Sequence, residues 1–239
     1  MIKATYINHM GCDMSVVNAA RVSFGKKIDR MYTKPEDEKL IRYLAEHKHM
    51  SPFGHCFVSF HVKAPIFVAR QLVKHKFLRW NEISRRYVDT DTEYYLPKTW
   101  RGRAKDKKQG SEGVVDLSSI LDTEHNTAIL GSGTLEGHVI EISEWLRETY
   151  KLLLDKGVCP EQARMVLPQS TMTEWYWSGS LDAFADMCNL RCASDTQAET
   201  REVATQISNR MRRLFPVSWA ALTDGLTEYK FGYEENNDE

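Results

Sequence analysis

The sequence of 239 residues contains no long hydrophobic run. No stretch of about 18 apolar residues occurs, and the opening residues MIKATYINHMGCDM form no signal-type segment. We therefore expect no contact with a membrane and a protein that stays in the cytoplasm. An excess of one charge is also absent, because 32 Lys and Arg residues nearly balance 33 Asp and Glu residues. The net charge of -1 gives no overall attraction to nucleic acid, so any polyanion site must be a local cluster.

Cysteine is scarce and irregularly spaced. The five cysteines are an odd number in a chain long enough to fold without disulfides, which predicts reduced thiols. Neither a C-x-x-C nor an H-E-x-x-H pattern occurs, so the sequence predicts no metal site. The five are Cys12, Cys56, Cys159, Cys188 and Cys192.

With 42% hydrophobic and 27% charged residues, the composition is that of an ordinary globular protein. The sequence contains no internal repeat. The length fits one large domain, which we place at residues 1–239. Alternating apolar residues predict strands, and helical apolar stripes with Pro or Gly at their ends predict helices. The expected strands are 2–8, 55–62 and 171–178. The expected helices are 13–20 with Asp13 as its cap, one starting at Pro35, 65–76, 135–156, 160–167, 181–190 and 197–214.

These elements predict an α+β fold in which helices pack around a small antiparallel sheet. Residues 98–113, KTWRGRAKDKKQGSEG, are polar, cationic and interrupted by glycine. We expect them to form a polar surface loop within the same domain.

The densest polar cluster is the segment 70–87, RQLVKHKFLRWNEISRRY, with six Lys or Arg residues and one His in eighteen positions. Such a density of cations favours an anionic ligand such as a phosphate. If the chain is extended after Glu82, then Glu82, Ser84 and Arg86 lie on one face of a strand and address one ligand. The alternative is a solvated helix end followed by a charged edge strand.

Several segments occur in the order typical of the flavin-dependent thymidylate synthase family, which the chain resembles over most of its length. They are AARVSF, SPFGH, HVKAPIFVARQ, NEISRRY, GVCPEQARMVLP and NLRCAS. The most specific motif of the family is an Arg-His-Arg triplet followed at fixed spacing by Asn-Glu-x-Ser-x-Arg-Tyr. Here the triplet is Lys74-His75-Lys76 and the second part is Asn81 to Tyr87.

The resemblance implies a homotetramer with FAD and dUMP bound where subunits meet. The implied reaction is reductive methylation of dUMP to dTMP, with carbon from methylenetetrahydrofolate and NADPH as reductant. It implies dUMP contacts from Gln71, Glu82, Ser84, Arg85, Arg86 and Arg164. It implies flavin contacts from Ser51, Lys74, His75, Lys76, Glu82, Ser180, Leu181, Asp182 and Asp186.

Two further residues carry implied roles. Arg191 matches the family arginine that contacts the uracil ring, and His49 matches a histidine near flavin and folate. A permanently charged guanidinium stabilises negative charge at N3 of uracil while C5 attacks the one-carbon unit. No protein nucleophile is required, so we assign Ser84 to binding rather than to attack on C6.

The chain also departs from the family pattern. Lys74 and Lys76 replace both arginines of the triplet, and a lysine offers a point charge in place of a planar fork. Asp186 and Asp195 stand where neutral or basic residues are expected, and loop 98–113 is longer than usual. Flavin affinity is the property that these changes affect most.

Three functional hypotheses follow. The first is the synthase, and the second is a related flavoenzyme that hydroxymethylates dUMP or acts on another pyrimidine nucleotide. The third is a non-catalytic nucleic-acid-binding module that uses the basic residues between 74 and 86 and between 101 and 108. The balanced net charge argues against the third hypothesis.

Overall fold

The structure is a computed structural model that describes residues 1–88, 92–105, 110–118 and 133–223. A four-stranded antiparallel sheet in the order β1-β2-β6-β3 forms its centre, and β4 pairs with β5 separately. The strands are β1 Lys3–Met10, β2 Phe57–Pro65, β3 Leu78–Glu82, β4 Trp100–Arg103, β5 Ser111–Val115 and β6 Met172–Ser180. The α-helices are α1 Asp13–Arg21, α2 Pro35–Glu46, α3 Ile66–Leu72, α5 Leu135–Asp155, α6 Pro160–Ala163, α7 Leu181–Arg191, α8 Ala198–Leu214 and α9 Pro216–Leu222. The short 3-10 helices are η1 Val22–Phe24, η2 Phe53–His55 and η3 Arg164–Val166.

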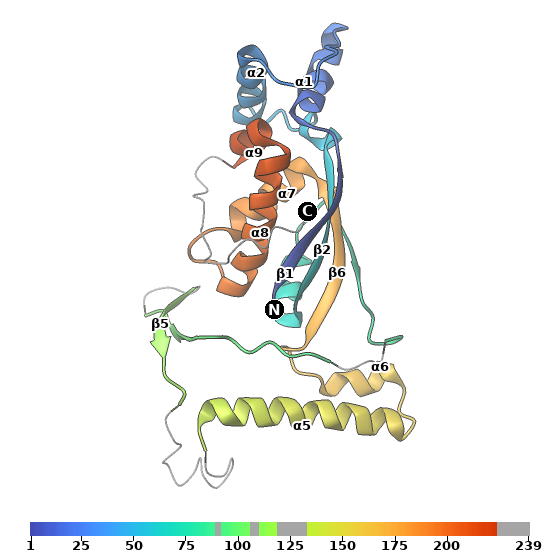
Figure 1. The fold of residues 1–239 in the computed structure, drawn as a ribbon, viewed down its shortest axis with the longest axis vertical. Coiled ribbons are helices and arrows are strands. Elements are labelled where there is room, and N and C mark those ends of the chain that lie inside the picture. Colours follow the sequence, from blue (N-terminus) through green and yellow to red (C-terminus); the bar gives the residue numbers. More distant parts are fainter. Residues whose placement is uncertain (89–91, 106–109, 119–132, 224–239) are drawn as a thin grey trace.

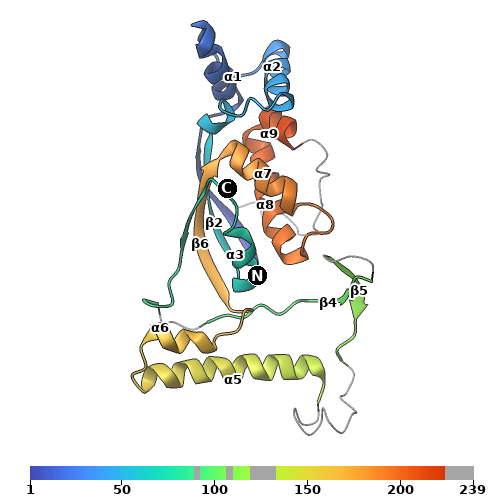
Figure 2. The ribbon, with the colours of Figure 1, turned by 180° about the vertical axis from the view of Figure 1, so that it is seen from behind.

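Helices lie on one face and at both ends of the sheet, which confirms the predicted α+β class. Helices α7, α8 and α9 cover one face, α1 and α2 lie at one end, and α5 and α6 lie beyond the other (Figures 1 and 2). Along β2, the alternating residues Val58, Phe60, Val62 and Ala64 are fully buried. This period of two places their side chains on the face that the helices cover.

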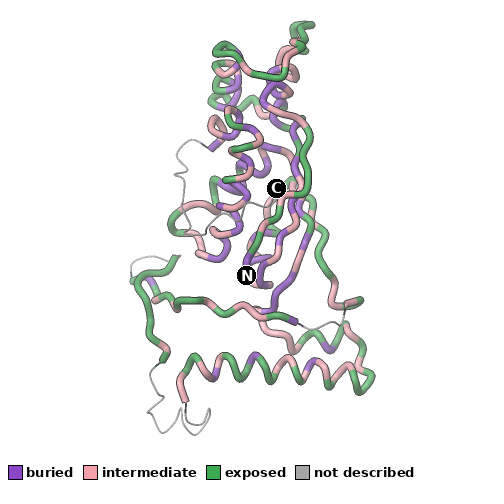
Figure 3. Tube along the Cα trace, in the orientation of Figure 1, coloured by how far each residue is buried: buried purple, intermediate pink, exposed green. Residues whose placement is uncertain are grey.

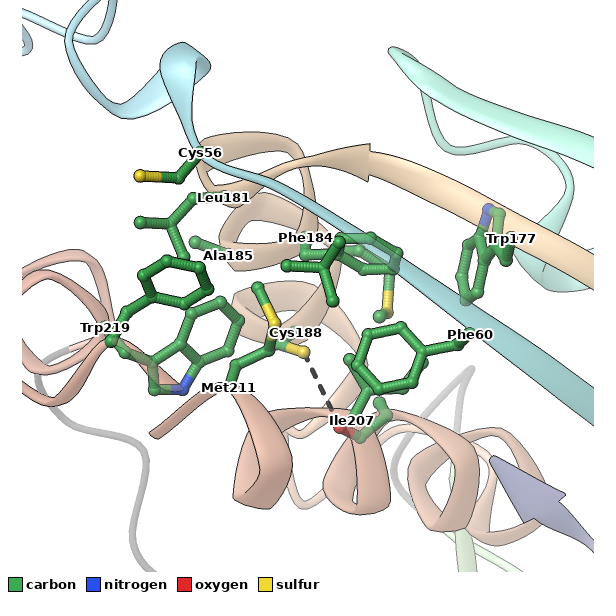
Figure 4. Close-up of a cluster of buried hydrophobic side chains, with 14 of the residues drawn as sticks. Cys56, Phe60, Trp177, Leu181, Phe184, Ala185, Cys188, Ile207, Met211 and Trp219 are labelled. Atoms are coloured by element: carbon green, nitrogen blue, oxygen red, sulfur yellow. Dashed lines mark hydrogen bonds between the residues drawn. The ribbon is translucent and has the colours of Figure 1, made fainter. Parts of the chain in front are cut away.

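In the core, α7 and α8 both pack against the sheet and against each other (Figure 4). The Phe184 ring of α7 lies edge-on to Phe60 of β2 and to Trp177 of β6, with ring centroids 5.4 and 5.6 Å apart. On its other side, the thiol of Cys188 donates to the carbonyl of Ala204 in α8 at 3.5 Å. Burying each large apolar side chain stabilises the fold by about 1.5–3 kcal/mol. Helix α7 is therefore held firmly through its buried face.

Helix α5 differs from the core helices. Figure 3 shows buried residues concentrated in the sheet and in α7 to α9, whereas α5 is exposed along much of its length. Its side chains Ile142, Trp145 and Leu152 are 47%, 68% and 59% exposed. None of the helices in the described part of the chain is both long and apolar enough to cross a bilayer.

The prediction for Asp13 was wrong. Cys12 takes the N-cap position of α1, and Asp13 is the first residue of the helix. The buried Asp13 carboxylate accepts hydrogen bonds from the backbone N–H groups of Val217 at 3.0 Å and Ser218 at 2.9 Å. It therefore caps α9, a helix distant in sequence whose own N-cap residue, Phe215, has no capping side chain.

The predicted helix 65–76 ends about one turn early. Pro65 is the last residue of β2, and α3 ends at Leu72. Phe77 adopts a left-handed conformation, with φ of 63°, and the chain then enters β3, a strand that was not predicted. Pairing with β6 explains the change, because it satisfies the backbone hydrogen bonds of residues 78–82.

The expectation of a plain loop at 98–113 was also wrong in part, because β4 and β5 form within it. Residues 106–109 of this segment lie outside the described residues. Arg101 of β4 forms an ion pair with Glu199 of α8, with its Nη2 2.8 and 2.9 Å from the two carboxylate oxygens. The predicted helix 160–167 is a four-residue α-helix, α6, followed by the 3-10 helix η3. The remaining predicted elements are confirmed, with ends shifted by a few residues.

Candidate active site

A cavity of about 500 Å³ lies where β3 ends and β6 begins. Its charged and hydroxyl-bearing lining includes five residues predicted to bind dUMP. They are Glu82, Ser84, Arg85, Arg86 and Arg164. Apolar residues from α3 and β6, among them Ile66 and Met172, complete the wall. Cations, one carboxylate and an apolar surface therefore meet in one cavity.

A turn directly after β3 presents the cations. The hypothesis that the chain stays extended to Tyr87 was wrong, because Tyr87 N–H donates to the Ser84 carbonyl at 3.0 Å and closes a turn. The Ser84 hydroxyl accepts from the backbone N–H and from Nε of Arg86, both at 3.3 Å. Such side-chain to backbone bonds are typical of Ser in turns. The Ser84 hydroxyl therefore orients the Arg86 side chain.

Arg164 reaches the same cavity from a distant segment. Pro160 starts α6, and Arg164 follows that short helix as the first residue of η3. Its Nε donates to the Glu161 carbonyl at 3.4 Å. Three guanidinium groups from two segments therefore line one cavity, which suits a phosphate dianion.

The Glu82 carboxylate is held on both of its oxygens. Thr173 Oγ1 of β6 donates to Oε1 at 2.7 Å, and Trp80 Nε1 donates to Oε2 at 3.1 Å. The Trp80 ring stacks on Trp175 with centroids 4.3 Å apart. Sequence reasoning missed both donors. Trp80 precedes Glu82 by two residues and so shares its strand face, which was a usable signal, whereas Thr173 required the register between β3 and β6.

A second group lies at the other end of β3. Arg191 is the last residue of α7, and its Nε donates to Nε2 of His75 at 2.9 Å. Burial, together with the adjacent Arg191 charge, lowers the pKa of His75 to about 4. Gln71, at the end of α3, has its Oε1 buried without a partner among the described residues. Lys74 and Lys76 flank His75 and are exposed.

The two groups lie at opposite ends of β3. At one end of β3, Leu78 pairs with Gly179, and at the other Glu82 pairs with Trp175. Four strand steps separate these ends by about 13 Å. Neither Gln71 nor Arg191 lines the cavity of Glu82. Five of the seven residues predicted to bind dUMP are thus brought together, and two lie elsewhere.

The other residues predicted to bind flavin gather around the start of α7. Ser180 is its N-cap residue, Leu181 is buried, and Asp182 and Asp186 follow one helical turn apart. Burial and the neighbouring Asp182 raise the pKa of Asp186, while Lys48 opposes that rise. Ser51 lies just before η2, which packs against α7.

His49 lies in the same region and is exposed. Its ring is 6.2 Å from Tyr43 and 6.4 Å from His47, and these three rings are roughly parallel. Lys48 between the histidines adopts a left-handed conformation with φ of 57°. Within the described ranges, no three His, Cys, Asp or Glu side chains gather in a way that would hold a metal ion.

The family profile described as thymidylate synthase complementing protein matches residues 5–217. A flavin-dependent thymidylate synthase of Thermus thermophilus is 40% identical over 225 residues, covering 94% of this chain and 77% of the relative. A flavin-dependent thymidylate synthase of Kosmotoga olearia is 41% identical over 213 residues, covering 89% of this chain and 86% of the relative.

Among solved structures, the UMP/dUMP methylase PolB of Streptomyces cacaoi bound with 5-Br dUMP is similar to this chain. It is 30% identical, with a TM-score of 0.77 and coverage of 94% of this chain and 95% of that one. The resemblance predicted from the motifs is therefore confirmed. Sequence profile, curated relatives and fold agree that the chain belongs to the flavin-dependent thymidylate synthase family.

Proposed function

We propose that this protein catalyses the reductive methylation of dUMP to dTMP. FAD is its cofactor, methylenetetrahydrofolate its carbon donor and NADPH its reductant. The observation that carries the proposal is the cavity in which Arg85, Arg86 and Arg164 accompany Glu82 and Ser84. The arginines match a nucleotide phosphate, and the Glu82 carboxylate, held by two donors, is placed to accept from a ribose hydroxyl.

Arg191 provides the chemistry at the base. The uracil ring must gain electron density at C5 before it attacks a one-carbon unit. A guanidinium stabilises the charge that develops on N3 and the adjacent carbonyl oxygens, and it stays protonated while doing so. Since Arg191 lies at the far end of β3 from the cavity, we infer that a second copy of the chain supplies it.

Helix α5 supports assembly into the homotetramer that we propose. Ile142, Trp145 and Leu152 leave an exposed apolar stripe along a helix of 21 residues. Exposed apolar surface of this kind favours contact with another protein chain. Active sites at subunit interfaces would then join the cavity of one subunit to the Arg191 of another.

The residues around α7 suit a flavin nucleotide in part. Lys74 and Lys76 supply charge for its phosphates, and Asp182 Oδ1, buried without a partner in the part of the chain described, would accept from a hydroxyl of its sugar or ribityl chain. The Asp182–Asp186 pair is less suited to phosphates, because its charge is negative. A bound flavin supplies the reducing chemistry, whereas the protein orients the uracil and excludes water.

An assay with dUMP, methylenetetrahydrofolate and NADPH tests the function, with dTMP measured by chromatography and flavin by its visible spectrum. We expect a yellow protein that makes dTMP. A colourless protein that cannot be loaded with FAD, or a product consisting only of hydroxymethyl-dUMP, would overturn the proposal.

Mixing inactive subunits tests the shared site. Arg164→Ala removes a cavity residue, and Arg191→Ala removes the residue at the far end of β3. Random assembly of the two variants restores about a quarter of the sites when each site draws on two chains. A site built within one chain recovers no activity, and each variant assembled alone is the control.

One observation favours a second substrate. The related PolB is described as a UMP/dUMP methylase, so UMP is a candidate substrate for this chain as well. The same assay with UMP in place of dUMP tests this second substrate. UMP differs from dUMP only by its 2′-hydroxyl group, so the assay measures whether the site tolerates that group.

We also propose a cytoplasmic location and the absence of membrane or nucleic-acid partners. All five cysteines are free thiols, as a reducing compartment requires. Fractionation of cells, followed by detection of the protein, tests the location.

A further inference from the structure

We infer that His75 is a positioning residue that orients the guanidinium of Arg191 toward the substrate. The inference rests on the proposed function, because it deepens the role of Arg191 at the uracil ring. It connects a residue of the Lys74–Lys76 loop, which is expected to hold flavin, with a residue expected to hold substrate.

The contact is direct. Arg191 ends α7, and its Nε donates to Nε2 of His75 at 2.9 Å. A cation is favourable at this place, because the C-terminus of a helix carries partial negative charge. The buried face of α7, which includes Phe184, Met187 and Cys188, packs in the core, so the helix that carries Arg191 has a defined position. What His75 adds is the direction of the side chain.

His75 is itself held from the opposite side. Its backbone N–H donates to the carbonyl of Leu72 at 3.1 Å, and Leu72 is fully buried at the end of α3. Two residues later, Phe77 takes its left-handed conformation, and Leu78 enters the sheet. The loop around His75 is thus fixed at both ends by core elements.

The protonation state suits the role of an acceptor. The pKa of His75 is lowered to about 4 by burial and by the Arg191 charge, so the ring is neutral near pH 7. A neutral imidazole that accepts at Nε2 carries its proton on Nδ1. A protonated ring would have no lone pair for Arg191 and would repel it.

The bond also selects which edge of the guanidinium meets the ligand. A guanidinium binds planar groups through two adjacent N–H donors. Since His75 takes Nε, the edge formed by the two terminal nitrogens is the one directed to the uracil. A ligand that shifts the Lys74–Lys76 loop would also shift Arg191 through this bond, so the two binding events would be coupled, and by linkage the coupling is reciprocal.

Two substitutions at His75 distinguish the loss of its hydrogen-bond acceptor from the loss of its side-chain volume. His75→Phe keeps a flat ring and removes the acceptor, while His75→Gln keeps an acceptor oxygen. With kcat measured at saturating FAD, we expect His75→Phe to lower kcat about tenfold and His75→Gln to recover most of that loss. Calorimetry should show the same order for the affinity of dUMP.

A double-mutant cycle with Arg191→Ala gives the decisive readout. If His75 acts through Arg191, His75→Phe has no further effect on dUMP affinity once Arg191 is removed. Equal losses in the two backgrounds, or parental turnover in His75→Phe, would overturn the inference. A parent protein that makes no dTMP contradicts the proposed function instead, whereas the cycle on dUMP affinity still judges the positioning role.

A spectroscopic test leaves His75 unchanged and so does not depend on whether a His75 variant folds. In protein labelled with ¹⁵N at histidine, we expect the His75 Nδ1 to carry the proton and Nε2 to show the shift of a hydrogen-bonded, unprotonated nitrogen. Arg191→Ala should move the Nε2 signal while leaving the other histidines unchanged. A proton on Nε2 in the parent protein contradicts the inference.

Discussion

The two ends of β3 use basic residues in different ways. At the Glu82 end, three arginines from loops and short helices line an open cavity, and Ser84 orders one of them through its hydroxyl. At the His75 end, one arginine emerges from a core helix and meets a neutral histidine. The first arrangement suits binding of a full negative charge, and the second suits charge that develops during a reaction.

On the proposed function, affinity and catalysis draw on separate parts of this chain. Loop cations tolerate small changes of position, because a phosphate accepts hydrogen bonds from many directions. A guanidinium that must face a developing charge needs a fixed direction, which a firmly packed helix and a histidine acceptor supply. The following predictions test this contrast, from the largest to the smallest expected effect on function, and the last one tests it through stability.

Arg191→Lys should cause the largest loss, because lysine keeps the charge and loses the planar fork. We expect turnover to fall by about two to three orders of magnitude, the range for a donor aimed at developing charge. FAD content should change little. Steady-state dTMP formation measures the effect, and parental turnover in this variant would remove Arg191 from the chemistry.

Lys74→Ala and Lys76→Ala should act on binding instead. Each lost charge-assisted hydrogen bond weakens FAD binding by about 1.5–3 kcal/mol, or roughly 10- to 150-fold. Replacing both residues with Arg should keep or tighten binding. Titration of apo-protein with FAD measures this, and unchanged affinity in the double Ala variant would mean that the cluster is merely solvated surface.

Thr173→Val should have a smaller effect at the Glu82 end. The change removes the 2.7 Å hydrogen bond to Oε1 of Glu82 at nearly constant shape. A net loss of about 1 kcal/mol predicts a rise in KM for dUMP of roughly fivefold with kcat nearly constant. Thr173→Ser is the matched control, because it keeps the hydroxyl. An equal rise in both variants would exclude positioning of Glu82.

The pH dependence of stability tests the neutral state of His75 in the folded protein. The pKa of His75 falls from 6.5 to about 4 on folding, so between these values the unfolded chain binds a proton that the folded chain does not. The His75 contribution to stability is therefore present above pH 6.5 and is lost as the pH falls toward 4. Thermal melting at several pH values should show a flatter profile for His75→Gln than for the parent. Parallel profiles would contradict the neutral state of His75.

Much of the fold followed from local patterns. The strands around Val58 and Trp177 and the helix that Pro35 starts lie close to where alternation and helix-start signals predicted them. The failures involve distant partners. Asp13 caps a helix some two hundred residues later, and residues 78–82 form a strand because β6 lies beside them. In neither case does the local sequence pattern indicate which distant segment will lie beside the residue.

The sequence by itself determined the class of protein, because the motif from Lys74 to Tyr87 and the family segments keep their spacing regardless of how the chain folds. It also determined which residue types are available for phosphate, ribose and uracil. Only the tertiary structure decided which of them meet. The β3–β6 register places Thr173 on Glu82, and the end of α7 places Arg191 on His75 rather than in the cavity. These contacts depend on packing between segments about ninety or more residues apart, where the position of each side chain is set by the core and not by its neighbours in sequence.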